Sequence, residues 1–177
     1  MLGEKSTKID SSQLNLADTF TNAFVNFGTS KDTLFNNKDD DRPWIQRVQK
    51  KGIFSAVCSL GLIHMWNFDE LSNIITDYFD LKDGYARAGA CVAIGLSVSG
   101  IYDENDPACA FLNEAVESED NIMKLGAAIG FGFAYSGSNR EDLKDNISEL
   151  IIDENLGVEV NANAAISLSH IFVGELD

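Results

Sequence analysis

The chain has 177 residues, of which 45% are hydrophobic and only two are proline. That length allows one core that buries roughly 70% of the unfolded surface, and the composition is globular rather than disordered. The 28 acidic residues outnumber the 13 basic ones and give a net charge of −15. Such a surface repels phosphate backbones and anionic lipid headgroups, so we expect neither nucleic acid nor a membrane as a partner. A basic protein would suit it, with solubility alone as the alternative reason for the acidity.

The residues that most often carry chemistry are few. Cys58, Cys91 and Cys109 lie in apolar stretches and are expected to be reduced, buried thiols. His64 and His170 are expected to be packed in the core. With no CxxC or GxSxG motif, neither a metal, a cofactor nor an activated nucleophile is predicted. The chain lacks an 18-residue apolar stretch and an apolar N-terminal core, so we expect an intracellular protein of the cytoplasm and nucleus.

Residues 1–50 are predicted to form one helix and a polar connection that leads into a repetitive region. Ser11 or Ser12 can cap the helix, and Gly28 can end it. The polar run 36–43, with its three aspartates at 39–41, is predicted to be a surface loop, because it lacks the DxDxDG order of a calcium loop. The apolar face of the helix comprises Leu14, Leu16, Phe20, Ala23, Phe24 and Phe27.

From residue 51 to residue 177, blocks of small and apolar residues recur. The glycines of block 89–100 follow the pattern G-x5-G-x4-G, which returns 37 residues later in block 126–137. Blocks 55–66 and 163–174 fill the same positions with other residues. A period of this length is typical of a solenoid. We therefore predict four helical-hairpin repeats, the last one incomplete, in an all-α fold of the α-α superhelix class.

Each repeat is predicted to pair two kinds of helix. The first is apolar nearly all round and must be buried on most sides. The second is more polar and covers it. Asp106 before Pro107, and Ser138 or Asn139 before residue 140, are expected to cap outer helices. The outer helices are predicted at residues 69–79, 107–117 and 140–152, and Gly100 and Gly137 are expected in left-handed caps.

Glycines inside the inner helices call for a separate explanation. Each costs about 1 kcal/mol relative to alanine in a helix. That cost is reasonable where two backbones must approach closely, whereas the spacing does not fit a phosphate-binding loop. The positions concerned are Gly89, Gly95, Gly126, Gly130 and Gly132.

Three blocks of the chain resemble PC (proteasome/cyclosome) repeats: SLGLIHMWNFDE, ARAGACVAIGLSVSGIYDENDP and LGAAIGFGFAYSGSNRED. These repeats occur in the two large non-ATPase scaffold subunits of the 26S proteasome and in the largest cyclosome subunit. With the upstream segment LADTFTNAFVNFGTSKDTLF, the resemblance covers nearly all of residues 14–177. The AYSGSNRED run and Trp66 favour one proteasome subunit over its larger sibling and over the cyclosome protein.

The resemblance implies a scaffold and not an enzyme. Family members are several times longer and close their repeats into a toroid, so this chain is expected to be part of such a ring, with open ends that expose helix faces. Expected partners are ubiquitin, the ubiquitin-like domains of shuttle receptors, a deubiquitinating enzyme and other regulatory-particle subunits, including the ATPases.

Outer helix 140–152 is the main candidate for a docking surface. Asp142, Asp145, Glu149 and Asp153 fall at i, i+3, i+7 and i+11, so they share one helical face, with no lysine or arginine in the stripe. Such a stripe is often only a solvated face. The family resemblance implies that acidic residues on these outer helices contact ubiquitin, and on the neighbouring helices the candidates are Glu114, Glu117, Asp77 and Asp80.

The alternative is a purely structural segment that organises neighbouring proteasome subunits and has no ubiquitin site. The two hypotheses differ in where the carboxylates point. Docking requires Asp142, Glu149 and Asp153 to face solvent beside Glu114, whereas pairing with basic residues of the chain weakens it. The sequence does not identify the apolar part of the groove that ubiquitin's apolar patch requires.

Overall fold

The computed structural model describes residues 11–35 and 44–174, and these residues form helices and no strands. The polar run 36–43 lies outside them. The α-helices are α1 Ser11–Val25, α2 Lys51–Ile63, α3 Phe68–Phe79, α4 Gly84–Ser97, α5 Pro107–Glu117, α6 Asn121–Ala134, α7 Lys144–Ile152 and α8 Val158–Ile171. Two short 3-10 helices, η1 Trp44–Gln46 and η2 Glu141–Leu143, precede α2 and α7.

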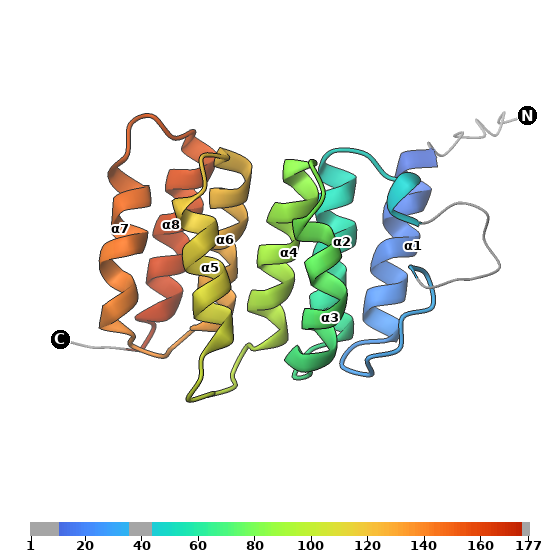
Figure 1. The fold of residues 1–177 in the computed structure, drawn as a ribbon, viewed down its shortest axis with the longest axis horizontal. Coiled ribbons are helices and arrows are strands. Elements are labelled where there is room, and N and C mark those ends of the chain that lie inside the picture. The colour runs from blue at the N-terminus through green and yellow to red at the C-terminus, as the bar shows by residue number, and fades with distance from the viewer. Residues whose placement is uncertain (1–10, 36–43, 175–177) are drawn as a thin grey trace, which may run out of the picture.

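The helices form two layers (Figure 1). Helices α2, α4, α6 and α8 pack side by side in an inner row. The outer helices α3, α5 and α7 each pack mainly on the inner helix that follows them in sequence. This arrangement confirms the predicted α-α solenoid.

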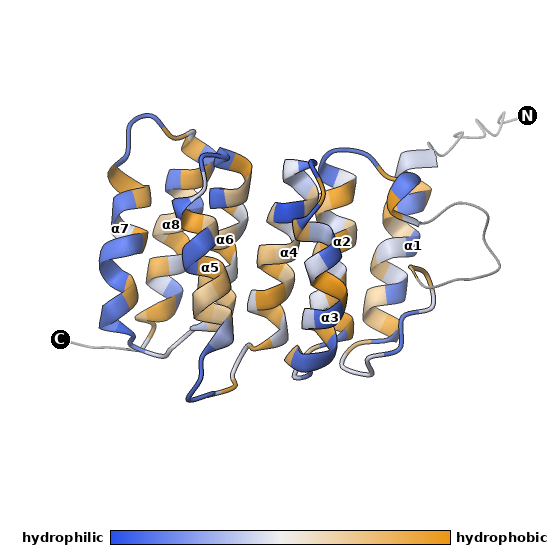
Figure 2. Ribbon diagram, in the orientation of Figure 1, coloured by the Kyte–Doolittle hydropathy of each residue, from blue (hydrophilic) through white to orange (hydrophobic). Residues whose placement is uncertain are grey.

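Burial differs between the layers as the composition predicts. Every residue of α4 from Ala88 to Gly95 is buried. Outer helix α3 buries only Leu71 and Ile75, and Figure 2 shows α7 as largely hydrophilic on the side toward the viewer. The inner row therefore forms the core, and the outer helices leave one face for solvent.

Glycines set the spacing of the inner row. A Cβ added to Gly95 would lie 2.6 Å from the Cα of Gly130. A Cβ added to Gly61 would lie 2.5 Å from the Cα of Ala93. Real Cβ atoms essentially never approach so closely. The prediction of close helix approach is confirmed, because only glycine lets α4 lie this near α6.

The third residue after each inner helix adopts the left-handed conformation. Gly100, Gly137 and Gly174 have φ of 76°, 70° and 94°, and Trp66 holds the same position with φ 67°. Gly28, after α1, has φ 65°, and its amide donates to the carbonyl of Leu62 at 3.0 Å. Helix α1 packs on α2 and so continues the inner row, while the predicted boundary at residue 50 stays a prediction.

The inner row is curved. Lys51 Nζ at the start of α2 lies 3.6 Å from Glu159 Oε1 at the start of α8. Two helices separate α2 from α8, and packed helices lie about 8–10 Å apart. Two side chains could not span a straight row of that width, so the ends of these helices must bend toward one another.

Three sequence expectations were wrong in detail. Asp106 does not cap α5: it has φ 42° and no capping hydrogen bond. Neither Ser138 nor Asn139 caps the third outer helix, which starts as the 3-10 turn η2 after Arg140. Helix α1 is present, but of its predicted apolar face only Ala23 is buried. Helix α1 instead packs through polar contacts, such as the Trp44 Nε1 bond to Thr19 Oγ1 at 3.1 Å.

Candidate docking surface

The four carboxylates predicted to form one stripe lie in three different settings. Asp145 and Glu149 are exposed on α7, and no ion pair among the described residues includes them. Asp142 lies in η2, before α7 begins. Asp153 ends α7 and accepts hydrogen bonds from the backbone amide and Nδ2 of Asn155, both at 2.9 Å. Only Asp145 and Glu149 therefore lie on regular helix.

Asp142 has a basic partner, contrary to the expectation that none relieves the stripe. Arg140 donates from Nε and Nη2 to its two carboxylate oxygens at 2.7 and 2.6 Å. These hydrogen bonds hold the pKa of Asp142 below its usual range. Arg140 also donates to Asp106 at 2.7 Å and lies over the ring of Tyr135 at 5.0 Å. Arg140 thus ties η2 to the start of α5 and the end of α6.

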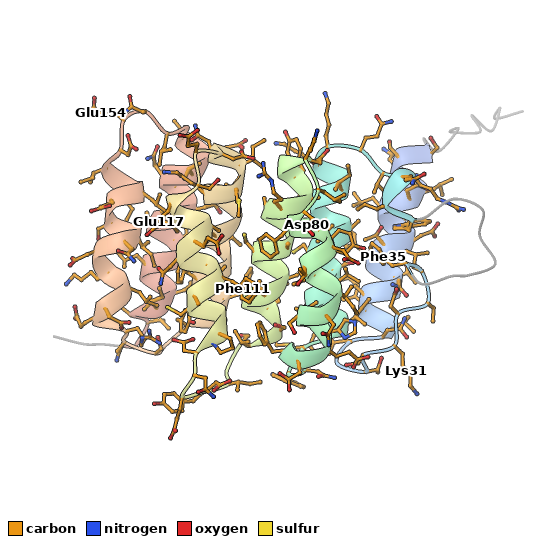
Figure 3. All side chains as sticks on the ribbon, viewed as in Figure 1. Lys31, Phe35, Asp80, Phe111, Glu117 and Glu154 are labelled. Atoms are coloured by element: carbon orange, nitrogen blue, oxygen red, sulfur yellow. The ribbon has the colours of Figure 1, made fainter. Side chains whose placement is uncertain are left out.

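A hollow of about 580 Å³ opens between the outer helices α3 and α5. Glu114 and Glu117 of α5 and Asp80, which caps the end of α3, line it. All three are exposed and belong to none of the ion pairs found among the described residues. Asp77 is exposed on α3 but does not line the hollow. Figure 3 shows Asp80 and Glu117 on the same side of the molecule as Phe111.

The floor of this hollow is apolar. The rings of Phe79 and Phe111 stack at 6.0 Å between centroids and 18° between planes, and Met123 lies beside them. Arg87 closes one side and pairs with Asp120 at 2.7 Å. Sequence reasoning missed this apolar part. The available signal was a large aromatic residue on each of two outer helices, next to the acidic candidates.

A side-chain hydrogen bond links the outer helices α5 and α7. Asn146 Nδ2 on α7 donates to Asn113 Oδ1 on α5 at 3.1 Å. Asp145 adjoins Asn146 in sequence, and Glu114 adjoins Asn113, so both candidate carboxylates lie on the helices that this hydrogen bond links. We call the exposed side of α3, α5 and α7, with the hollow, the outer face.

The histidines and cysteines of the chain differ in their burial. His64 is buried as expected, whereas the expectation for His170 was wrong, because it is exposed on α8. All three thiols are free, and burial raises the pKa of Cys58 and of Cys91 to about 12. Among the described residues there is no cluster suited to a metal ion, and none of their helices is long and apolar enough to cross a bilayer.

Comparison with known proteins places the chain among proteasome subunits. No family model matches it. It is 34% identical over 176 residues to the 26S proteasome non-ATPase regulatory subunit 2 of Dictyostelium discoideum, a match that covers 99% of the chain and 20% of that protein. The 26S proteasome regulatory subunit rpn1 of Schizosaccharomyces pombe is 37% identical over 172 residues, with 97% of the chain and 19% of that protein covered.

The chain is less similar to the other large non-ATPase subunit of the proteasome. The 26S proteasome regulatory subunit rpn2 of Schizosaccharomyces pombe is 29% identical over 164 residues, which cover 89% of the chain. The chain spans about a fifth of the length of the first two relatives. Because the stronger similarity runs along nearly the whole chain and coincides with its helical repeats, the chain belongs to the family of the 26S proteasome non-ATPase regulatory subunit 2.

Proposed function

We propose that this chain is part of a scaffold of the 26S proteasome regulatory particle, and that its outer face docks ubiquitin or the ubiquitin-like domains of shuttle receptors. The observation that carries the proposal is the hollow between α3 and α5. There, Asp80, Glu114 and Glu117 surround an apolar floor formed by Phe79 and Phe111. An apolar patch ringed by basic residues, which ubiquitin offers, is the physical complement of such a surface.

The two parts of the hollow have different roles in docking. The exposed carboxylates attract a basic surface and orient it, which mainly raises the association rate. The aromatic floor supplies the area from which water is expelled. Since the hollow is shallow and open, a single ubiquitin should bind with a dissociation constant on the order of tens of micromolar or weaker. Tight binding then requires chains that engage several sites at once.

The remaining assignments follow from this scaffold role. The chain has no catalytic activity of its own. Its partners in the particle are other regulatory subunits, including ATPases, and a deubiquitinating enzyme can dock on the same scaffold. The protein works in the cytoplasm and nucleus.

The alternative, a structural segment without a ubiquitin site, has one observation in its favour. Asp142 is held by Arg140, and Asp153 bonds within its own turn, so two of the eight candidate carboxylates serve the fold. This alternative requires the hollow to remain empty in solution.

Titration of isotopically labelled ubiquitin with the chain separates the two. The chain should shift amide signals around ubiquitin's apolar patch, and Glu114→Arg with Glu117→Arg should remove these shifts. The matched control is Asp18→Arg with Glu104→Arg, which makes the same charge change at exposed positions on α1 and in the loop between α4 and α5. The control should bind as the wild type does.

Each other outcome has a defined meaning. Ubiquitin shifts that persist with Glu114→Arg and Glu117→Arg but vanish with Asp145→Arg and Glu149→Arg would move the docking site to α7. Equal loss in the control would show general charge attraction. No shifts at millimolar concentration, with a folded chain, would establish the structural alternative.

A further inference from the structure

A second surface lies where the inner helices end, at the lower edge of the view in Figure 1. Trp66 is 59% exposed there, and Ile101 and Tyr102, in the loop between α4 and α5, are 45% and 89% exposed. Phe27, 43% exposed, meets Trp66 edge-on with ring centroids 6.1 Å apart. We call these four residues the aromatic edge. Contiguous apolar side chains in solvent indicate a surface that another molecule covers.

A hollow of about 190 Å³ lies behind the aromatic edge. Its apolar lining includes Trp66, Phe68 and Pro107, and its acidic lining includes Asp69 and Asp103. A second hollow, on the other side of the α4–α5 loop, shares Ile101, Asp103, Asp106 and Tyr135 with the first. The two hollows together form one edge groove around the loop.

The edge groove is negatively charged. Asp106 is neutralised by Arg140, whose guanidinium also binds Asp142. Asp69 and Asp103 are exposed, and no ion pair of the described residues includes them. Helices α3 and α5 begin here, and each helix N-terminus contributes about +0.5 charge. Those two half-charges offset only one of the two free carboxylates, and Glu70 and Glu104 add to the negative side.

Trp66 is held in place before any partner arrives. Its backbone amide donates to Ser97 O at 2.7 Å, and its Nε1 donates to Ser99 O at 3.2 Å. It stands in the left-handed position that Gly100 and Gly137 take in the next two repeats. A residue with a side chain is strained there, and an indole that remains 59% exposed recovers little of that cost by burial.

We propose that the edge groove binds a segment of a partner protein that presents an arginine or lysine next to a large apolar side chain. The stem of the cationic side chain lies on Trp66 and Phe68, and its charge faces Asp69 and Asp103. The apolar neighbour covers Ile101 and Tyr102. Charge complementarity selects this occupant, since an acidic segment would meet uncompensated carboxylates. The proposal does not depend on ubiquitin docking at the outer face.

The test uses the 177-residue chain and a fluorescein-labelled peptide of four residues in which arginine and leucine alternate. Fluorescence anisotropy follows the binding of the peptide. The Trp66→Gly variant places in the first repeat the residue that the later repeats use, so the fold is retained. It should weaken binding about ten-fold. Asp69→Asn with Asp103→Asn should weaken binding roughly five-fold, with a smaller dependence on salt.

Controls separate the groove from the overall acidity of the chain. The Asp18→Asn with Glu154→Gln variant makes the same charge change at exposed positions outside the groove and should bind as the wild type does. Peptides in which glutamate replaces arginine, or alanine replaces leucine, should not bind. The proposal is overturned if the wild type does not bind at millimolar peptide, if Trp66→Gly binds as tightly, or if the Asp18→Asn with Glu154→Gln variant loses as much affinity as the groove variants.

Discussion

Replacing Gly95 with alanine should destabilise the solenoid by about 2 kcal/mol. The new Cβ would lie 2.6 Å from the Cα of Gly130, on the facing helix α6. Both obstacles, this Cα and the adjoining carbonyl, are backbone atoms, so no change of rotamer relieves the contact. Helices α4 and α6 must separate by at least about 0.8 Å for this Cα to reach the 3.4 Å of ordinary contact, and by more for the nearer carbonyl oxygen. Overpacking of this severity costs about 3 kcal/mol, and the better helix propensity of alanine returns about 1 kcal/mol.

Urea unfolding followed by helical circular dichroism measures the effect. For a chain of this size, the expected loss lowers the melting temperature by about 4–8 °C. Gly52→Ala in α2 is the matched control, because the nearest atom to its new Cβ is Val48 Cβ at 3.5 Å, an ordinary contact. The control should be unchanged or slightly more stable. If Gly95→Ala unfolds at the wild-type urea concentration with an unchanged m-value, the close-packing argument is wrong.

Three further predictions concern buried polar groups. Burial lowers the pKa of His64, whose ring nitrogens have no hydrogen-bond partner among the described residues. Because the unfolded chain then binds the extra proton more readily, the free energy of unfolding should fall as the pH drops below about 6.5. His64→Leu should flatten that part of the plot of urea-derived stability against pH. Arg140→Gln leaves the partly buried Asp106 carboxylate without its cation and should cost about 1–2 kcal/mol in the same assay, with incomplete rescue by lysine. The thiols of Cys58 and Cys91 should react with a thiol reagent only after unfolding, because burial raises the pKa of each to about 12; rapid labelling of the folded chain would contradict this.

The outer face illustrates how far sequence reasoning reached. Spacing placed Asp145 and Glu149 on one side of a helix, because helical periodicity is a local property. Spacing could not reveal that the Arg140 side chain donates to the Asp142 carboxylate, because the 3-10 turn η2 replaces the first turn of the expected α-helix. Nor could it reveal the apolar floor, because Phe79 and Phe111 are 32 positions apart in sequence and meet only when α3 and α5 pack.

The sequence by itself determined the order of helices, their alternation between apolar and polar kinds, and the glycines that close the inner row. These features depend on local propensity and on the glycine pattern of block 89–100, which returns in block 126–137. Only the tertiary structure decided which polar groups are used by the fold. Asp106 accepts hydrogen bonds from Tyr135 and Arg140 instead of capping α5, and His170 is exposed on α8, the last described helix of the inner row. Both outcomes depend on contacts between repeats, which no local pattern encodes.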